Sequence, residues 1–449
     1  MSNEYEAVIL GAGNAGLAAA GAARAAGQRV LVVEGRDVGG VCPLRGCVPK
    51  KVLVAAAQTL DAIARAGTHE IEVGPATLNW SRLINRKRTF VDGVPEEFEK
   101  SLANRGIDLV RGKARFVGPQ EIAVAGDRYV SEKIIVATGS TPRSLPIPGA
   151  EHLMTSDGLL ELSSLPNSVV FVGAGVIAFE FAHVLARAGT RVTLLEVAPR
   201  VLPAFDSEAA EQIAVATRDL GVRIETGVAI DRVAARGEGY AVHFQHAGEK
   251  TSASAEIAVN GAGRVADLTG LDLVAAGITL ERGGIELDEY LRSVENPNVF
   301  FAGDAIPGRP QLSPLATYEG NVVGHNLAHE KLQAVKYGHQ PAAVYTVPSL
   351  ATVGLTEEAA TDAGSEFEVR TNDMREWRSA RTHAETTAWA KVLIERGSNR
   401  ILGAHLVGHG AEETIHTFAL AIEKGFTASD IASRVYAYPT FHSDLKFLV

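Results

Sequence analysis

The chain has 449 residues and an ordinary globular composition, with 46% hydrophobic and 21% charged residues. This length allows roughly three domains of about 150 residues each, so the chain can bury a large core. The net charge of −10 disfavours nucleic acids and anionic membranes as partners, because both attract basic surfaces. We find no apolar run of about 18 residues and no leader-like segment at the N-terminus, so we expect no membrane association.

The chain contains two cysteines. A secreted protein of this size that relied on disulfides would use more of them, so a reducing, cytoplasmic location is expected. In that compartment a disulfide is more often catalytic than structural.

Two stretches repeat one pattern of strand, glycine-rich turn, helix, strand and terminal acid. The first runs from an apolar strand at 5–10 to Glu34, and the second from an apolar strand at 168–172 to Glu196. In both, the acid follows the first glycine of the turn by 23 residues. A GxGxxG turn between a strand and a helix, with an acid about 20 residues further on, is the fingerprint of dinucleotide binding. The sequence therefore predicts an α/β fold with two Rossmann-like domains.

The glycines of each turn permit a tight bend and let the backbone approach a pyrophosphate, while the acid accepts hydrogen bonds from a ribose. The residues predicted for these roles are Gly11, Gly13, Gly16 and Glu34 in the first copy, and Gly173, Gly175, Ala178 and Glu196 in the second. Glu196 would repel a 2′-phosphate, which favours NADH over NADPH. Arg200 is either a solvated loop cation or a phosphate contact, so NADPH stays possible.

Both cysteines lie in the segment 39–51, directly after the first copy. Cys42 and Cys47 are about 1.4 helical turns apart, so a slightly distorted helix would bring their sulfurs together. A helix N-terminus and neighbouring lysines would lower the pKa of a thiol and favour the reactive thiolate. Two unpaired buried cysteines are the alternative, which the position after a Rossmann unit disfavours.

The rest of the chain predicts a linker, an isolated strand and a further domain. Three prolines at 139–149 indicate the linker. An apolar strand is expected at 298–302. Strands at 390–395 and 401–408 and a helix near 412–425 indicate an α+β domain with no nucleotide motif.

The cysteine segment resembles the redox-active disulfide signature of the class I pyridine nucleotide-disulfide oxidoreductases, the family of glutathione reductase, dihydrolipoamide dehydrogenase and mercuric reductase. Motifs along nearly the whole chain are similar to the same family: Ala137-Thr138-Gly139, Gly263-Arg264, Ala302-Gly303-Asp304, 353–357 and 401–405. The resemblance implies an FAD-binding domain at 1–145 and 263–335, an NAD(P)-binding domain at 146–262, and a dimerisation domain at 340–449. It also implies a homodimer in which the partner's C-terminal domain completes each active site.

The resemblance implies roles for individual residues. Cys42 would attack the substrate, and Cys47 would lie beside the isoalloxazine ring of FAD. Lys51 would pair with Glu180 near flavin N5, with an ordinary salt bridge between domains as the alternative. Asp304 would contact the ribityl chain. The other positions assigned to nucleotide binding are Gly40, Thr138, Gly139, Gly263 and Ala316.

The C-terminal segment departs from the family pattern. The family's disulfide reductases carry a His-Pro-Thr motif whose histidine protonates the leaving thiolate, but Tyr438 occupies that position here. A tyrosine can donate a proton but is a poor base near neutral pH. The alternative donor is His442 with Asp444, which would share one face of a regular strand. Both Tyr438 and His442 could instead be ordinary packing or surface residues.

The identity of the electron acceptor stays open. The resemblance implies that a glutathione reductase would carry an arginine on the first helix to hold a glutathione carboxylate, and the small residues there disfavour glutathione disulfide. Arg45 would either attract an acidic substrate or cap a loop. We predict that NAD(P)H electrons pass through FAD to the Cys42–Cys47 disulfide, which reduces a small disulfide or a related electrophile. The alternative is a flavin reductase of quinones, metal ions or oxygen that bypasses the cysteines. No bound metal is expected.

Overall fold

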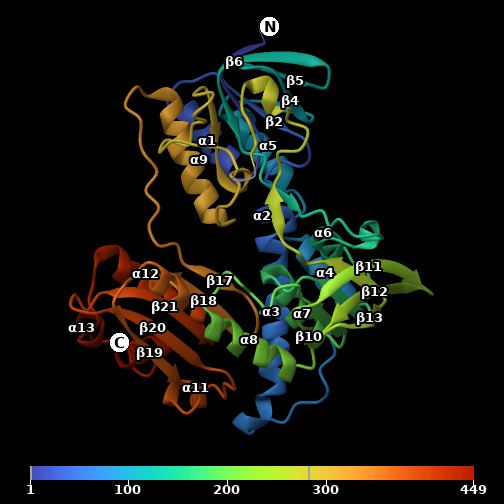
Figure 1. Cartoon of the computed structure of the whole chain (residues 1–449), viewed down its shortest axis with the longest axis vertical. Coiled ribbons are helices and arrows are strands. Elements are labelled where there is room, and N and C mark those ends of the chain that lie inside the picture. The colour runs from blue at the N-terminus through green and yellow to red at the C-terminus, as the bar shows by residue number, and fades with distance from the viewer. Residues whose placement is uncertain (1–2, 282–283) are drawn as a thin grey trace. The chain divides into compact units, whose positions relative to one another are not determined.

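Sheets and helices alternate along most of the chain, as the alternation of apolar strands and amphipathic helices predicts. The computed structural model describes residues 3–281 and 284–449 (Figure 1). The chain divides into two units, 1–50 with 86–143 and 264–336, and 51–85 with 144–263 and 337–449. The expected α/β fold class is confirmed. The domain boundaries drawn from the sequence stay a prediction, and the grouping of 51–85 with the second unit was not anticipated.

A seven-stranded sheet forms the centre of the first unit, with the strand order β3-β2-β1-β6-β5-β4 and β16 paired to β6. Its strands are β1 (Glu4–Leu10), β2 (Val30–Glu34), β3 (Asp108–Arg111), β4 (Ala114–Gly118), β5 (Glu121–Val124), β6 (Asp127–Val136) and β16 (Val299–Phe301). β1 runs parallel to β2 and β6, and its residues 7–10 are almost completely buried. The strand expected at 298–302 is β16, which runs parallel to β6.

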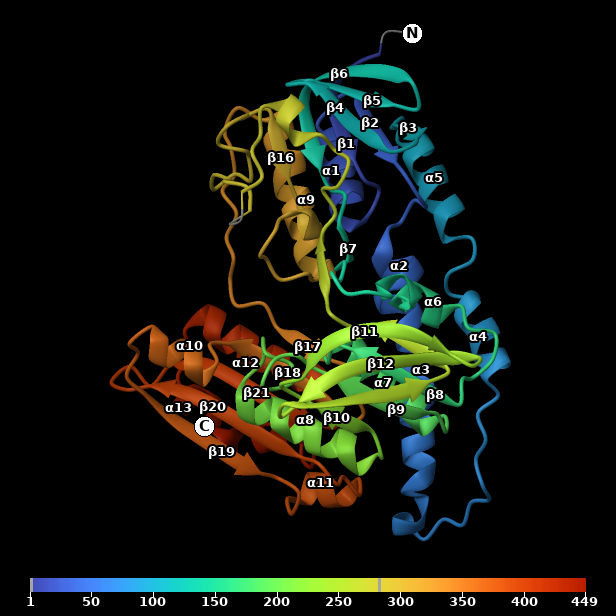
Figure 2. The same ribbon diagram turned by 45° about the vertical axis from the view of Figure 1, so that its right-hand side comes forward.

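Helices α1 (Asn14–Ala25) and α9 (Ser313–Ala328) lie side by side in this unit (Figure 2). Small residues make this approach possible, because a Cβ atom on Gly320 would lie 2.2 Å from the Ala15 carbonyl oxygen. The same contact brings the two N-termini together, where the Asn14 side chain donates a hydrogen bond to Ser313. The unit also holds α2 (Val41–Arg45), α5 (Val94–Asn104) and the beginning of α3 (Cys47–Ala64).

The proline-rich stretch at 139–149 is more ordered than a linker. It begins with β7 (Ser140–Pro142), which pairs antiparallel with β15 (Arg264–Ala266). As the sequence predicted, residues 139–149 form no helix. The pairing of β7 with β15 was not expected, because so short a strand shows no alternation of apolar and polar residues.

The second unit contains a Rossmann-like portion with a parallel sheet in the order β10-β9-β8-β14. This unit also contains an antiparallel sheet in the order β11-β12-β13 (Figure 1). The elements are β8 (Ser168–Val172), α7 (Val176–Arg187), β9 (Arg191–Leu195), α8 (Ser207–Asp219), β10 (Arg223–Glu225), β11 (Ala229–Arg236), β12 (Gly239–His246), β13 (Glu249–Ala255) and β14 (Ile257–Asn260), with α4 (Trp80–Arg88) and α6 (Ser156–Leu160).

The C-terminal part of this unit is the expected α+β domain, an antiparallel sheet in the order β17-β18-β21-β20-β19. Helix α12 packs against β18 and β21. The elements are β17 (Ala342–Val344), β18 (Ser349–Gly354), α10 (Glu357–Asp362), β19 (Phe367–Asp373), α11 (Arg378–Thr382), β20 (Trp389–Glu395), β21 (Ile401–Gly408), α12 (Ala411–Lys424), α13 (Ala428–Ala432) and α14 (Leu445–Leu448). Across residues 3–281 and 284–449, no helix is both long and apolar enough to cross a bilayer.

Candidate active site

The two cysteines lie on either side of a break between two helices. Helix α2 ends at Arg45, α3 begins at Cys47, and Gly46 separates them. A Cβ atom on Gly46 would lie 2.9 Å from the Val41 carbonyl oxygen, so the break needs a residue without a side chain. No disulfide joins the two sulfurs in this structure, and Cys42 is partly buried while Cys47 is exposed. The single distorted helix expected from the spacing is therefore two helices.

Hydrogen bonds lower the pKa of the Cys42 thiol to about 6. The largest cause is the hydrogen bond from the Cys47 side chain, with smaller ones from the Ser313 and Asn14 side chains and the Cys47 backbone N–H. Burial alone would raise this pKa, but the hydrogen bonds outweigh it. A thiol with this pKa is mostly thiolate near neutral pH, and the thiolate is the nucleophilic form.

Asn14 and Ser313 are functional candidates that the sequence did not reveal. They begin α1 and α9, and 299 residues separate them in the chain. The one local signal was the polar residue that follows Gly13 in the first glycine-rich turn. Ser313 belongs to no motif singled out in the sequence.

Arg45 donates a hydrogen bond to Asp37 at 2.7 Å. Asp37 precedes the glycines of the same segment, so this ion pair supports the loop-capping role among the two that the sequence left open. The half-exposed Asp37 carboxylate also offsets the positive charge that would attract an acidic substrate.

The first glycine-rich turn forms a backbone cradle at the N-terminus of α1. A Cβ atom on Gly11, whose φ is +110°, would lie 2.3 Å from the Ala137 carbonyl oxygen. Gly40 has a φ of +73°, and a Cβ atom there would lie 2.6 Å from the Gly13 Cα. Glu34 accepts a hydrogen bond from the Ala12 N–H at 2.7 Å, which fixes the acid beside the turn. Such a cradle fits the pyrophosphate and ribose of a dinucleotide.

Polar groups that could form further hydrogen bonds lie near this cradle. The Thr138 hydroxyl is buried and has no hydrogen-bond partner within residues 3–281 and 284–449. Asp304 accepts a hydrogen bond from the Ser140 hydroxyl at 2.9 Å, and burial raises the pKa of its carboxyl. An orphaned buried hydroxyl is costly unless a ligand satisfies it. These residues therefore fit the FAD that the resemblance implies.

The remaining positions assigned to FAD are arranged close to these groups. A Cβ atom on Gly16 would lie 1.9 Å from the Gly11 carbonyl oxygen, so α1 passes tightly over the turn. Ala316 lies beside Gly303 at the start of α9. Gly139 directly follows Thr138 and has a φ of +74°.

The second glycine-rich turn has the same construction within the second unit. Gly173 has a φ of +106°, Gly175 precedes α7, and Ala178 is fully buried on that helix. Glu196 accepts hydrogen bonds from the Ala174 N–H at 2.7 Å and the Ala198 N–H at 2.9 Å. Gly263, with a φ of +91°, lies at the end of this unit.

Arg200 is engaged by its own loop. Its guanidinium donates hydrogen bonds to the carbonyl oxygens of Phe205 at 3.0 Å and Pro203 at 3.0 Å, and more weakly to that of Leu202 at 3.4 Å. Glu358 lies 3.8 Å away as an ionic partner. These contacts support the loop-cation interpretation rather than the phosphate contact.

Lys51 and Glu180 are brought together in the second unit. The Lys51 Nζ lies 3.5 Å from Glu180 Oε1, and Glu180 is 1% exposed on α7. The Tyr345 backbone N–H donates to the same Oε1 at 2.8 Å, and the Tyr345 ring lies against the Lys51 ammonium. Tyr345 is a further residue that the sequence did not reveal.

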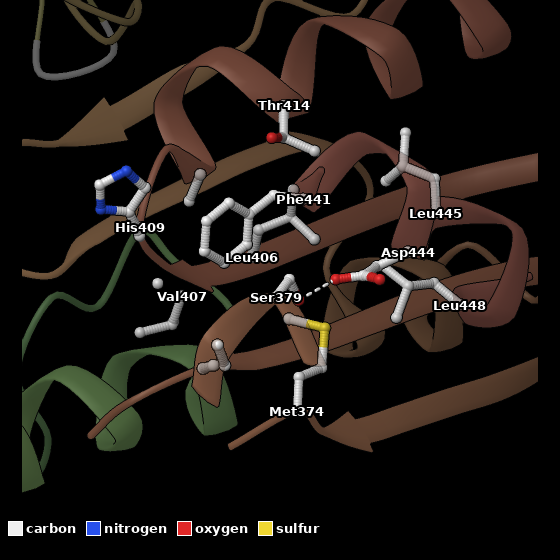
Figure 3. Close-up of a pocket in the computed structure, with 14 residues that line it drawn as sticks. Met374, Ser379, Leu406, Val407, His409, Thr414, Phe441, Asp444, Leu445 and Leu448 are labelled. Atoms are coloured by element: carbon white, nitrogen blue, oxygen red, sulfur yellow. Dashed lines mark hydrogen bonds between the residues drawn. The ribbon is translucent and has the colours of Figure 1, made fainter. Parts of the chain in front are cut away.

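The C-terminal segment separates its two candidate proton donors. Tyr438 is exposed, whereas His442 lies in a short 3-10 helix, Phe441–Asp444. The Asp444 carboxylate accepts a hydrogen bond from Ser379 inside a pocket of the C-terminal domain (Figure 3). The expectation that His442 and Asp444 share a strand face was wrong, because residues two apart in a 3-10 helix point in different directions.

Aromatic side chains stack at the rim of the same pocket. His409 stacks with Phe441 and with His383, and its Nδ1 lies 3.3 Å from Glu385. The hydrogen bond to Glu385 raises the pKa of His409. Among the described residues, no group of three or more His, Cys, Asp and Glu side chains has an arrangement suited to a metal ion.

Two family models match the chain. The pyridine nucleotide-disulphide oxidoreductase model covers residues 5–320, and the dimerisation domain of the same family covers residues 340–448.

Curated relatives match along nearly the whole chain. A mercuric reductase of Bacillus cereus is 31% identical, over 99% of this chain and 71% of that protein. A glutathione reductase of Burkholderia cepacia is 30% identical, over 99% and 98%. A dihydrolipoyl dehydrogenase of Geobacillus stearothermophilus is 32% identical, over 97% and 94%.

The fold is also similar to a solved structure. The Cu(II) complex of the HOCl-induced flavoprotein disulfide reductase RclA from Escherichia coli superposes with a TM-score of 0.89 at 28% identity. The match covers 100% of this chain and 99% of that one. The likeness therefore includes the residues of both units.

Proposed function

Because the chain belongs to the pyridine nucleotide-disulphide oxidoreductases, we propose that Cys42 and Cys47 are its redox-active pair. The predicted family, enzyme class and cofactors are confirmed: the chain is an NAD(P)H-dependent flavoprotein oxidoreductase. Bound FAD supplies a two-electron relay between the nicotinamide nucleotide and the thiol pair. The residues that would hold it are Gly11, Gly13, Gly16, Glu34, Gly40, Thr138, Gly139, Asp304 and Ala316.

The observation that carries the proposal is the hydrogen bonding at Cys42, which leaves that sulfur as a thiolate near neutral pH. With a disulfide substrate, the Cys42 thiolate attacks one substrate sulfur, forms a mixed disulfide and releases the other sulfur as a thiolate. The Cys47 thiolate then attacks Cys42, which releases the second substrate thiolate and leaves a Cys42–Cys47 disulfide. The pair loses two electrons and the substrate gains them, and two protons end on the product thiols.

Tyr438 is the group that we propose as proton donor to the leaving thiolate. The family's dimerisation domain at residues 340–448 supports a homodimer. We infer that the tail with Tyr438 completes the partner's active site, since Tyr438 is 63% exposed and Val435 is fully exposed. This exposure leaves the segment available for contact with a partner subunit.

NADH is the nucleotide that the second glycine-rich turn favours. Glu196 is held at the ribose position by two backbone amides, and Arg200 is engaged by loop carbonyls. The fixed Glu196 carboxylate repels a 2′-phosphate, and Arg200, which already donates to loop carbonyls, does not offset this repulsion. We expect kcat/KM to be higher with NADH than with NADPH, and Arg200→Ala to leave this ratio nearly unchanged. A large loss of NADPH turnover in that variant would contradict the inference.

A soft metal ion is a second candidate acceptor for the same thiol pair. Thiolates are the ligands that soft ions prefer, and a metal ion produces no leaving thiolate that must be protonated. This candidate agrees with the absence of a histidine at position 438. It also agrees with the mercuric reductase of Bacillus cereus among the similar proteins, since Hg(II) is a soft ion. RclA was solved as a complex with Cu(II), which is a borderline ion. The cysteine-independent flavin reductase is not favoured, because these relatives are disulfide reductases and mercuric reductases.

The test is a panel of acceptors with NADH, measured in the wild type and in the double variant Cys42→Ala/Cys47→Ala. The panel contains glutathione disulfide, lipoamide, coenzyme A disulfide, Hg(II), Cu(II) and a quinone. We expect the physiological class of acceptor to lose turnover in the double variant while FAD stays bound. Full turnover of every reducible acceptor in that variant would refute the proposal.

A further inference from the structure

Tyr345 contacts both members of the Lys51–Glu180 pair. Its backbone N–H donates to Glu180 Oε1 at 2.8 Å, and the Lys51 Nζ lies 3.0 Å from the centroid of its ring. All three residues belong to the second unit. We propose that Tyr345 is a positioning residue whose ring holds the Lys51 ammonium against Glu180.

The three residues come from elements that are distant in the sequence. Lys51 is on α3 and Glu180 on α7, while Tyr345 directly follows β17. The neighbours of Tyr345, Val344 and Thr346, are both almost completely buried. The backbone at Tyr345 is therefore fixed on both sides, so its ring presents a defined face.

The ion pair alone does not fix the ammonium. Its 3.5 Å separation is longer than the 2.7–2.9 Å of a strong charge-assisted hydrogen bond, and the Lys51 side chain is 32% exposed to competing water. A lysine ammonium ends a flexible four-carbon stem that loses rotamer freedom when it is held. The ring adds a further restraint, because its centroid lies well within the roughly 6 Å range of cation–π attraction.

The Tyr345 side chain and backbone act on different partners. The ring acts on Lys51, and the N–H acts on Glu180. A side-chain substitution removes the ring and leaves the N–H, so it separates the two effects. Its functional consequence rests on the proposed function: where Lys51 acts beside the flavin, Tyr345 determines where that cation lies.

The experiment measures how fast acetic anhydride acylates Lys51 in the FAD-bound protein. Acylation requires a free, neutral amine, so a held ammonium reacts slowly. Acylated Lys51 resists trypsin, so in chains cut after unmodified Lys50 the peptide 51–65 replaces 52–65 and reports on Lys51. The exposed Lys424 provides an internal reference in every sample.

In the Tyr345→Leu variant we expect Lys51 to be acylated about tenfold faster than in the wild type, because the cation–π contact is lost. Tyr345→Phe keeps the ring and should react at the wild-type rate. If the leucine variant loses FAD or melts early, Tyr345→Met replaces it as an unbranched apolar substitute. Wild-type acylation in the leucine or methionine variant would overturn the proposal, as would equal acceleration in the phenylalanine variant.

A kinetic readout accompanies the labelling. We expect Tyr345→Leu to lower kcat for NADH oxidation while the KM for NADH changes by less than about twofold, since the ring does not bind the nucleotide in this account. An unchanged kcat together with faster acylation would show that the position of the Lys51 ammonium does not affect turnover. The labelling result does not depend on whether Cys42 and Cys47 carry electrons, so failure of the proposed function is recognised separately.

Discussion

The reactivity of Cys42 should follow the hydrogen bonds that converge on it. Its pKa of about 6, against an ordinary value of 9.0, makes about nine-tenths of the sulfur thiolate near pH 7. An unperturbed thiol would be only about one-hundredth thiolate there. Removing the largest contact with Cys47→Ala should therefore raise the midpoint of Cys42 alkylation by about one pH unit or more. Cys47→Ser, which keeps a donor hydroxyl, should shift the midpoint less.

The assay is iodoacetamide alkylation of the reduced protein over a range of pH. Trypsin cuts after Arg45, between the two cysteines, so each thiol is read on its own peptide. Asn14→Ala and Ser313→Ala should each raise the Cys42 midpoint by a smaller amount than Cys47→Ala, because their hydrogen bonds contribute less. A wild-type midpoint near the ordinary value, or an unchanged midpoint in Cys47→Ala, would refute the reasoning.

Further predictions concern the nucleotide site and the stability of the second unit. Glu196→Ala should raise kcat/KM for NADPH relative to NADH, and an unchanged ratio would show that the carboxylate does not select the nucleotide. Lys391→Met should destabilise the protein by about 3–5 kcal/mol in urea unfolding, because Asp206 would then be buried without its cation; a loss below about 1 kcal/mol would contradict this. The hydrogen bond to Glu385 raises the pKa of His409. The stabilisation from this pair is therefore fully present below pH 6.5, the pKa in the unfolded chain, and is lost as pH rises through the pKa of the folded protein. The Tm difference between wild type and His409→Gln should therefore be larger near pH 5.5 than near pH 8.5, by a small amount because His409 is half exposed; a constant difference would argue against it.

Local signals predicted the geometry of the two glycine-rich turns. A glycine-rich turn, the following helix and an acid at fixed spacing form one continuous segment, so sequence distance and spatial distance agree. Glu34 and Glu196 accordingly both accept hydrogen bonds from backbone amides of their own turns. The cysteine segment was predicted as one distorted helix, but it forms two helices separated by Gly46.

Two contacts across long stretches of chain were not predictable, whereas the Lys51–Glu180 pair was expected from the family resemblance and is present. Asn14 meets Ser313 across 299 residues, and Tyr345 meets Glu180 across 165 residues. No periodicity records such contacts, because packing of separate elements creates them. The wrong expectation about His442 and Asp444 has a local cause. The Thr440 hydroxyl caps a 3-10 helix, so these residues form a helical turn instead of the expected strand.

Anaerobic equilibration of the air-oxidised protein with NADH tests the central claim most directly. Alkylation of the protein before and after NADH, read separately on the Cys42 and Cys47 peptides, shows whether the nucleotide's electrons reach this pair. The account predicts that both cysteines resist alkylation before NADH and that both become alkylated afterwards. Flavin reduction by NADH with both cysteines still protected, or with both already free beforehand, would contradict it.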